Sequence, residues 1–153
     1  MAFAFHILGT SSSGNCSLLE VGGARVMLDA GFQGPRLEAS LQKLGIEARA
    51  LDAVFITHEH SDHCVGLPAL LRQNPRLKVF ANRATATTLQ AGLKHRVDWQ
   101  LFETGGTFRF RDLEAEVDGV LFRTFATAGD TVAEAVDDPQ FRARGMLVEH
   151  FDE

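Results

Sequence analysis

Four side chains that can bind metal ions stand within six consecutive residues of this sequence: His58, His60, Asp62 and His63. They directly follow residues 51–57, whose apolar run is typical of a strand that is buried on both faces. On an extended segment, residues i and i+2 project to the same side, so His58 and His60 can approach one cation together. Asp62 and His63 stand where the chain turns into the next predicted helix, and they can reach a second cation close by.

The ligand types of this histidine loop (residues 58–63) indicate the chemistry. Imidazole and carboxylate suit zinc, manganese or iron, so the predicted cofactor is two divalent metal ions, Zn, Mn or Fe. Two cations about 3.5–4 Å apart can share one water and hold both the attacking and the leaving oxygen of a displacement. That arrangement suits hydrolysis of a phosphodiester or of an activated acyl bond.

The other candidate donors have simpler interpretations. His6, His95 and His150 are isolated in the sequence, and isolated histidines are usually structural or solvated. Cys64 could be a soft ligand, but a buried cysteine at a helix start is the favoured interpretation. Glu59 is expected to point away from the cations. The zincin motif is rejected, because it needs two histidines at i and i+4 on a helix.

The elements around the loop predict an α/β domain in which strands and helices form layers. Gly22-Gly23 suits a tight turn between two strands, and Gly45 is expected to end a helix marked by three leucines at helical spacing. Strands are predicted at residues 2–8, 16–21, 24–28, 51–57, 77–81, 97–102, 107–110 and 113–122, a polar loop at 10–15, and helices at 37–44, from 62–64 to 74–75, and at 84–93.

Composition excludes several classes of protein. Hydrophobic residues make up 45% and charged residues 23%, which argues against disorder. No apolar run approaches the ~20 residues that span a bilayer, so no membrane partner is expected. The chain has only two cysteines, Cys16 and Cys64, too few for a disulfide framework, and its N-terminus is unlike a signal peptide. We therefore expect a cytoplasmic protein. With a net charge of -5, nucleic acid would have to be attracted by metal ions and a local basic patch.

The histidine loop resembles the signature of the metallo-β-lactamase superfamily. Residues 8–17 (LGTSSSGNCS), residues 26–31 (VMLDAG) and residues 57–63 (THEHSDH), taken in order, are similar to its YycJ/WalJ-like branch. The match runs from about residue 3 to residue 115. The resemblance implies an αβ/βα sandwich with metals at the edge of two central sheets, and a cytoplasmic metal-dependent hydrolase with exonuclease activity on DNA.

The same resemblance implies roles for the loop. His58 and His60 would bind the first metal, Asp62 and His63 the second, and Asp62 would also position the nucleophilic water. Asp29 corresponds to a strand-end carboxylate that steadies the histidine loop. The alternative for Asp29 is a simple turn carboxylate.

A second family-like segment is the polar loop that contains Ser12, Ser13, Gly14 and Asn15. The resemblance implies that its backbone N–H groups contact a substrate phosphate beside the metals. An ordinary polar turn is the alternative.

The resemblance breaks downstream. The family site also takes a third histidine, a bridging aspartate and a late histidine, but only His95 and His150 follow the loop. The turn expected to carry the third histidine compares with residues 125–130, where Asp130 is a remnant or a plain loop residue. We therefore expect residues 1–125 to form the N-terminal part of the sandwich and residues 126–153 a divergent acidic tail.

Such a chain, whether a truncated gene product, a fragment of a longer chain or a degenerate member that dimerises, would leave an apolar sheet face. We expect a second copy or a second half-domain to cover that face. Three hypotheses about function follow from the sequence: a dinuclear phosphodiesterase acting on DNA, a half-domain without catalysis, and an acyl hydrolase that cleaves a thioester or lactone.

Overall fold

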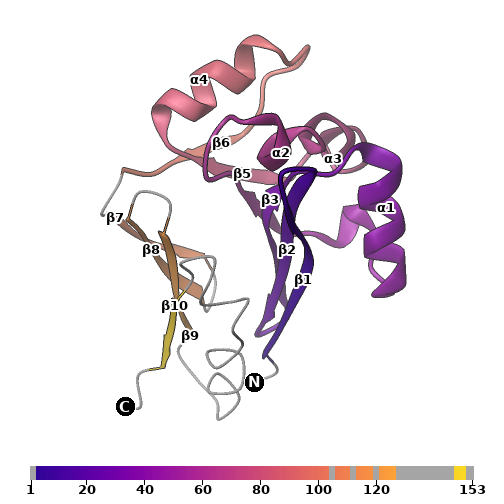
Figure 1. Cartoon of the computed structure of the whole chain (residues 1–153). Coiled ribbons are helices and arrows are strands. Elements are labelled where there is room, and N and C mark those ends of the chain that lie inside the picture. Colours follow the sequence, from indigo (N-terminus) through magenta and orange to yellow (C-terminus); the bar gives the residue numbers. More distant parts are fainter. Residues whose placement is uncertain (1–2, 104–105, 111–112, 119–120, 127–146, 151–153) are drawn as a thin grey trace.

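The computed structural model describes residues 3–103, 106–110, 113–118, 121–126 and 147–150. Its strands form two sheets, one of six strands in the order β1-β2-β3-β4-β5-β6 and one of four in the order β10-β9-β8-β7 (Figure 1). The strands are β1 (Phe3–Ser11), β2 (Gly14–Val21), β3 (Ala24–Ala30), β4 (Ala53–Phe55), β5 (Lys78–Ala81), β6 (Trp99–Leu101), β7 (Gly106–Phe110), β8 (Leu113–Asp118), β9 (Leu121–Ala126) and β10 (Leu147–His150). The helices are α1 (Gly34–Lys43), the 3-10 turn η1 (Ala48–Ala50), α2 (Ser61–Cys64), α3 (Leu67–Gln73) and α4 (Arg83–Ala91).

The six-stranded sheet changes direction at β3. Strands β1, β2 and β3 are antiparallel neighbours, whereas β3, β4, β5 and β6 run parallel. The predicted hairpin between β2 and β3 is confirmed, with Gly22 and Gly23 at φ 53° and 78°, the left-handed values that a tight primed turn needs. Parallel strands require crossovers, and helices supply them after β3, β4 and β5. The carboxyl ends of these strands therefore meet at one edge of the sheet.

The helices bury their apolar sides on one face of this sheet. Leu37 and Leu41 of α1 are 1% exposed, which confirms the helix predicted from their spacing. Gly45 follows α1 with φ 71°, a conformation that an L side chain rarely adopts, so the predicted stop is also confirmed. Val54 of β4 and Ile56, which directly follows β4, belong to this core and are fully buried.

The opposite face of the sheet carries an aromatic group. Phe55 stacks on Phe80 with ring centroids 4.4 Å apart, and both rings are buried. Among residues 4–103, Val65 and Leu101 are the exposed large hydrophobic side chains. The expected open apolar face is therefore absent from that part of the six-stranded sheet.

The polar segment at residues 10–15 is a hairpin rather than a loop, so this expectation was wrong. β1 continues to Ser11 and β2 starts at Gly14, leaving Ser12 and Ser13 as the turn. The hydroxyl groups of Ser11 and Ser13 lie 2.6 Å apart, so the turn satisfies its own polar groups. The segment is consequently held by strand pairing at the edge where β3 ends.

The helix predicted from residues 62–64 to 74–75 is divided into α2 and α3. The Gly66 N–H donates to the carbonyl of Ala30 at 2.8 Å, at the end of β3. A Cβ on Gly66 would lie 2.3 Å from the carbonyl oxygen of Phe32, so only glycine allows this approach. Docking of the chain onto β3 therefore interrupts the helix directly after the histidine loop.

The single strand predicted at residues 113–122 is two strands, β8 and β9, which pair antiparallel. The register ends at Asp118 opposite Leu121, and the sequence Asp118-Gly119 is a strong hairpin signal that the apolar pattern obscured. His150 lies in β10, which runs parallel to β9 and places His150 opposite Ala126. In the described part of the chain, no helix has the length and hydrophobicity that crossing a membrane requires.

Candidate metal centre

Three segments that are distant in sequence meet at the carboxyl edge of the six-stranded sheet. Cys16 pairs with Ala30, which places the β1–β2 turn beside the end of β3. Leu28 pairs with Phe55, so the residues after β4 leave the sheet beside Asp29. The topology thereby brings the β1–β2 turn, Asp29 and the histidine loop together.

Asp29 is the anchor of this edge. It is buried and has φ 57°, a left-handed conformation that costs about 1–2 kcal/mol in most residues but that Asp tolerates. Its Oδ1 accepts the backbone N–H of Thr57 at 2.8 Å, and its Oδ2 lies 2.6 Å from Nδ1 of His63. These contacts place Asp29 where a carboxylate can steady the loop, rather than in a simple turn.

The contact with Asp29 fixes the state of His63. A carboxylate only accepts hydrogen bonds, so Nδ1 of His63 must carry the hydrogen. In the neutral ring this leaves the Nε2 lone pair directed away from Asp29. A histidine oriented by a carboxylate in this way is a common arrangement for a metal ligand.

Asn15 joins the β1–β2 turn to the loop. Its side-chain amide lies 3.2 Å from Oδ2 of Asp62 and 3.3 Å from Nε2 of His63, and it also donates to the carbonyl of Ser11 at 3.0 Å. The role expected for Asn15 was contact of its backbone N–H with a substrate phosphate, and that role stays a prediction. Its side chain contacts two of the four loop donors.

The imidazole rings of the loop are clustered. The ring centroid of His58 lies 3.9 Å from that of His63 and 4.7 Å from that of His60. The Thr57 hydroxyl is 2.9 Å from Nδ1 of His58 and also contacts Asp29. Burial, followed by the nearby His63, lowers the pKa of His58, so this ring stays neutral and able to coordinate at neutral pH.

Two neighbours of these donors are directed elsewhere. The Glu59 carboxylate accepts the Thr85 hydroxyl at 3.1 Å, and its own backbone N–H together with that hydroxyl lowers the pKa of the Glu59 side chain. The Cys64 thiol donates to the carbonyl groups of Glu59 and His60, and burial raises its pKa. Cys64 is buried at the last residue of α2, not at a helix start, and its raised pKa favours the thiol over a thiolate ligand.

The donors fit one part of a divalent metal site. Two ligand atoms that are each about 2.0–2.2 Å from a tetrahedral ion lie roughly 3.3–3.6 Å apart. Nε2 of His63 and Oδ2 of Asp62 lie 3.5 Å apart, which is that spacing. Within the described part of the chain, no group of three or more His, Cys, Asp or Glu side chains is arranged to hold an ion.

The remaining sequence candidates lie outside this cluster. His95 is exposed, and His6 lies 3.3 Å from Glu20 on β1 and β2. The side chain of His150 and all of Asp130 lie outside the described residues.

A pocket opens beside the cluster, with a volume of about 530 Å³. Arg36 provides its positive charge, and the guanidinium of Arg36 lies 3.8 Å from the centroid of the Phe32 ring. A Cβ on Gly9 or Gly14 would come within 2.6 Å of the Phe32 ring, so these glycines make room for it. The pocket is lined by Ser12, Ser13, Gly31, Gln33, Pro35, Arg36, Ser61, Asp62 and Val65.

Sequence reasoning missed several residues of this site. Thr57 is adjacent to the first histidine and could have been included from its position in the motif. Arg36 and Phe32 carry no such signal, because their contact depends on the turn between β3 and α1. Thr85 is 26 residues from the Glu59 that it binds.

Known proteins resemble this chain in sequence and in fold. Residues 24–149 match a family model described as a beta-lactamase superfamily domain. The chain is 33% identical over 124 residues to exodeoxyribonuclease WalJ of Streptococcus pneumoniae serotype 2, strain D39, and 30% identical over 122 residues to exodeoxyribonuclease YycJ of Bacillus anthracis. Each alignment covers 78% of this chain and 46% of the relative, so the chain spans about half the length of these relatives.

A solved structure supports the same fold. The subclass B3 metallo-beta-lactamase BJP-1 of Bradyrhizobium japonicum superposes with a TM-score of 0.63 at 15% identity, over 74% of this chain and 48% of the other. The expected α/β architecture of the metallo-β-lactamase type is therefore confirmed. The family match extends over most of the chain and includes β3, Asp29 and the histidine loop. The chain belongs to the beta-lactamase superfamily, with its relatives in the YycJ/WalJ-like branch.

Proposed function

We propose that this chain is a dinuclear metal-dependent phosphodiesterase that acts on nucleic acid, with DNA exonuclease as its specific activity. The observation that carries the proposal is the orientation of His63 by Asp29, with Nε2 of His63 3.5 Å from the Asp62 carboxylate. The exonuclease names of the two relatives at 30–33% identity support nucleic acid as the substrate class.

In this proposal His58 and His60 hold the first of two divalent ions, Zn, Mn or Fe, and Asp62 and His63 hold the second. When bound, such ions supply Lewis-acid activation of water and stabilise negative charge on the phosphate. Asp29 keeps the hydrogen of His63 on Nδ1, and the low pKa of His58 keeps that ring unprotonated. Asp62 also positions the attacking water through its carboxylate.

The pocket beside Asp62 takes the scissile phosphate. Arg36 supplies a positive charge whose position is set by the buried Phe32 ring, and a guanidinium can bind two phosphate oxygens at once. Ser12 and Ser13, which form the β1–β2 turn, also line this pocket, where they can contact the substrate. This part of the proposal retains the substrate role of the β1–β2 turn, while Asn15 acts on the loop and Gly14 accommodates Phe32.

A second candidate function is a half-domain without catalysis. It is favoured because, among the described residues, no three His, Cys, Asp or Glu side chains converge on a point where they could hold an ion. An ion held by only two side chains would bind weakly and would leave no organised pair for hydrolysis.

The proposal includes a cytoplasmic location. Cys16 and Cys64 are both buried as thiols, which fits a reducing compartment. Association with a second copy or with a second half-domain remains a prediction.

The test is a panel of substrates hydrolysed with Zn²⁺, Mn²⁺ or Fe²⁺: bis-p-nitrophenyl phosphate, end-labelled DNA, and a thioester. The proposal predicts turnover of both phosphodiesters, and loss of this activity in His60→Ala with the fold retained, because His60 is exposed. His6→Ala is the matched control and should keep the wild-type rate. Turnover of the thioester alone would establish the acyl hydrolase, and no turnover of any substrate would favour the half-domain.

A further inference from the structure

One stretch of the chain has a charge opposite to that of the whole. Residues 63–97 contain six arginines and lysines and no aspartate or glutamate, although the chain has a net charge of -5. The six are Arg72, Arg76, Lys78, Arg83, Lys94 and Arg96. This stretch extends from the last residue of the histidine loop to two residues before β6, so positive charge is concentrated on the elements that follow the loop.

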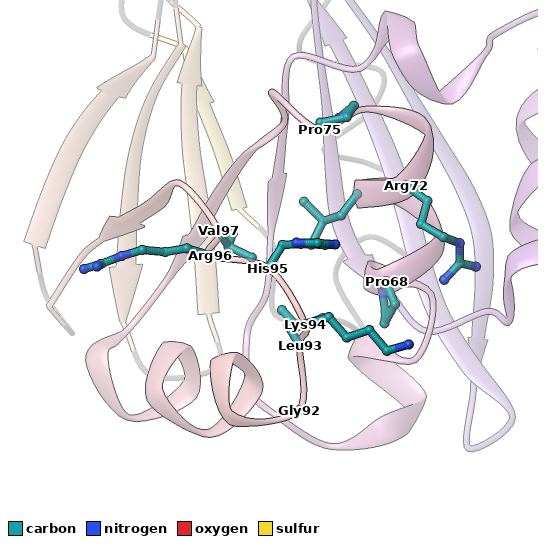
Figure 2. A pocket seen from close by; sticks show the side chains of 10 residues that line it. Pro68, Arg72, Pro75, Gly92, Leu93, Lys94, His95, Arg96 and Val97 are labelled. Atoms are coloured by element: carbon teal, nitrogen blue, oxygen red, sulfur yellow. The ribbon is translucent and has the colours of Figure 1, made fainter.

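The same stretch forms a pocket of about 680 Å³ between α3 and the segment that connects α4 to β6. Arg72 and Lys94 extend toward the same side of this pocket, while Arg96 extends away (Figure 2). Arg72 and Lys94 are exposed, and no carboxylate lines the pocket. The basic pocket, as we call it, is therefore positive and open to solvent.

The walls of the basic pocket restrict the kind of anion it fits. Its apolar lining is aliphatic or proline, namely Pro68, Leu71, Pro75, Leu93 and Val97, with no phenylalanine or tryptophan. Bases of single-stranded nucleic acid usually stack on aromatic side chains, and the lining of this pocket offers only the His95 ring for that contact. Phosphates, in contrast, need only cationic donors.

The basic pocket lies close to the candidate metal centre along the chain. Val65 lines the pocket beside Asp62 and Pro68 lines the basic pocket. Their positions differ by three, so their Cα atoms are at most roughly 11 Å apart. Successive phosphates of one B-form strand advance about 3.4 Å along the helix axis, so a few nucleotides can connect the two pockets.

We propose that the basic pocket binds backbone phosphates of a nucleic-acid strand whose scissile bond lies at the histidine loop. This inference rests on the proposed nuclease function and names a contact surface for its substrate. Arg72 and Lys94 bind the phosphates, and the contact is independent of base identity. It supplies the local basic patch that a protein with this net charge needs to attract a polyanion.

The test measures binding separately from hydrolysis. The affinity of a fluorescently labelled single-stranded oligonucleotide is measured by anisotropy in EDTA, over a range of salt concentrations, for wild type and for Arg72→Gln/Lys94→Gln. The pocket variant should bind about tenfold more weakly. The slope of log K against log salt should decrease in magnitude by about 1.4, because two phosphate contacts to a single strand are lost.

The matched control is Lys43→Gln/Arg49→Gln, which removes the same charge from two exposed side chains outside the basic pocket. Its affinity and salt slope should stay close to wild type, and thermal unfolding of both variants verifies the fold. Equal loss of affinity in both double variants would overturn the proposal. Displacement of the oligonucleotide by a mononucleotide at equal concentration would also overturn it, in favour of a small-molecule site.

Failure of this inference differs from failure of the proposed function. Hydrolysis of bis-p-nitrophenyl phosphate by wild type tests the metal centre without any contact to the basic pocket. If wild type hydrolyses this ester but the pocket variant binds DNA as tightly as wild type does, the proposed role of the basic pocket is refuted and the proposed function is not.

Discussion

Gly31 is the position where a single methyl group should disturb the candidate metal centre most directly. A Cβ on Gly31 would lie 1.8 Å from the carbonyl oxygen of Asp62 and 2.6 Å from the backbone nitrogen of Asn15. Even the tight limit of 3.0 Å requires the Asp62 carbonyl to move by about 1.2 Å. Gly31→Ala therefore displaces the backbone of Asp62, which carries one of the metal donors. It also displaces Asn15, whose side chain contacts the donor atoms of both Asp62 and His63.

The size of the effect follows from this displacement. Inserting a methyl group into a closely packed site costs about 1–3 kcal/mol of unfolding free energy. A shift of about 1 Å at reacting groups costs on the order of a hundredfold in rate. We therefore expect Gly31→Ala to lose about a hundredfold in phosphodiester hydrolysis while the protein remains folded.

Gly45→Ala provides a control of similar stability. Gly45 has φ 71°, and a Cβ added there would meet no atom within 4 Å, so the variant suffers only the left-handed strain of about 1–2 kcal/mol. Urea denaturation measures the stability of both variants, and steady-state hydrolysis of bis-p-nitrophenyl phosphate measures their activity. If Gly31→Ala and Gly45→Ala have the same rate and metal affinity, the packing of Gly31 against Asp62 does not position the site.

Three further predictions concern the neighbours of the loop. Asp29→Asn keeps a residue that tolerates the left-handed backbone but removes the carboxylate from His63, so metal affinity in a competition titration should fall about 10–100-fold; an unchanged affinity would exclude this role. Arg36→Gln should raise the KM for a phosphodiester about tenfold with little change in kcat, whereas Arg49→Gln should not; a kcat effect alone would place Arg36 elsewhere in the reaction. The pKa of His58 in the folded protein lies below 6.5, so at a pH near these values the unfolded chain binds more protons at this residue than the folded chain does. The metal-free protein should therefore lose stability as the pH falls through 6.5 toward the folded pKa. Thermal unfolding at several pH values measures this loss, and His58→Gln should flatten the dependence.

Much of the fold could be predicted because its signals are local. Gly22-Gly23 specifies a tight turn, and the leucine spacing in α1 specifies one buried helix face. The break between α2 and α3 could not be predicted, because it depends on the Gly66 N–H reaching the carbonyl of Ala30. The β8–β9 hairpin was missed because apolar residues continue on both sides of Asp118.

The candidate site shows the same division. The loop donors stand together in the sequence, and the family resemblance identifies Asp29 without its contact with His63. The side-chain contact of Asn15 with Asp62 could not be predicted, because it depends on the strand register that brings the amide to the loop. The cation–π contact of Arg36 likewise depends on tertiary packing. Contacts between distant segments are what the sequence pattern alone could not supply.

The central claim is that the histidine loop holds divalent cations, and elemental analysis of the purified chain tests it most directly. After loading with Zn²⁺ or Mn²⁺ and removal of excess metal, we expect two ions per wild-type chain. We also expect a clear loss of bound metal in His60→Ala, with the circular dichroism spectrum unchanged. A wild-type chain that retains no metal, or a His60→Ala variant with the same metal content as wild type, would contradict the claim.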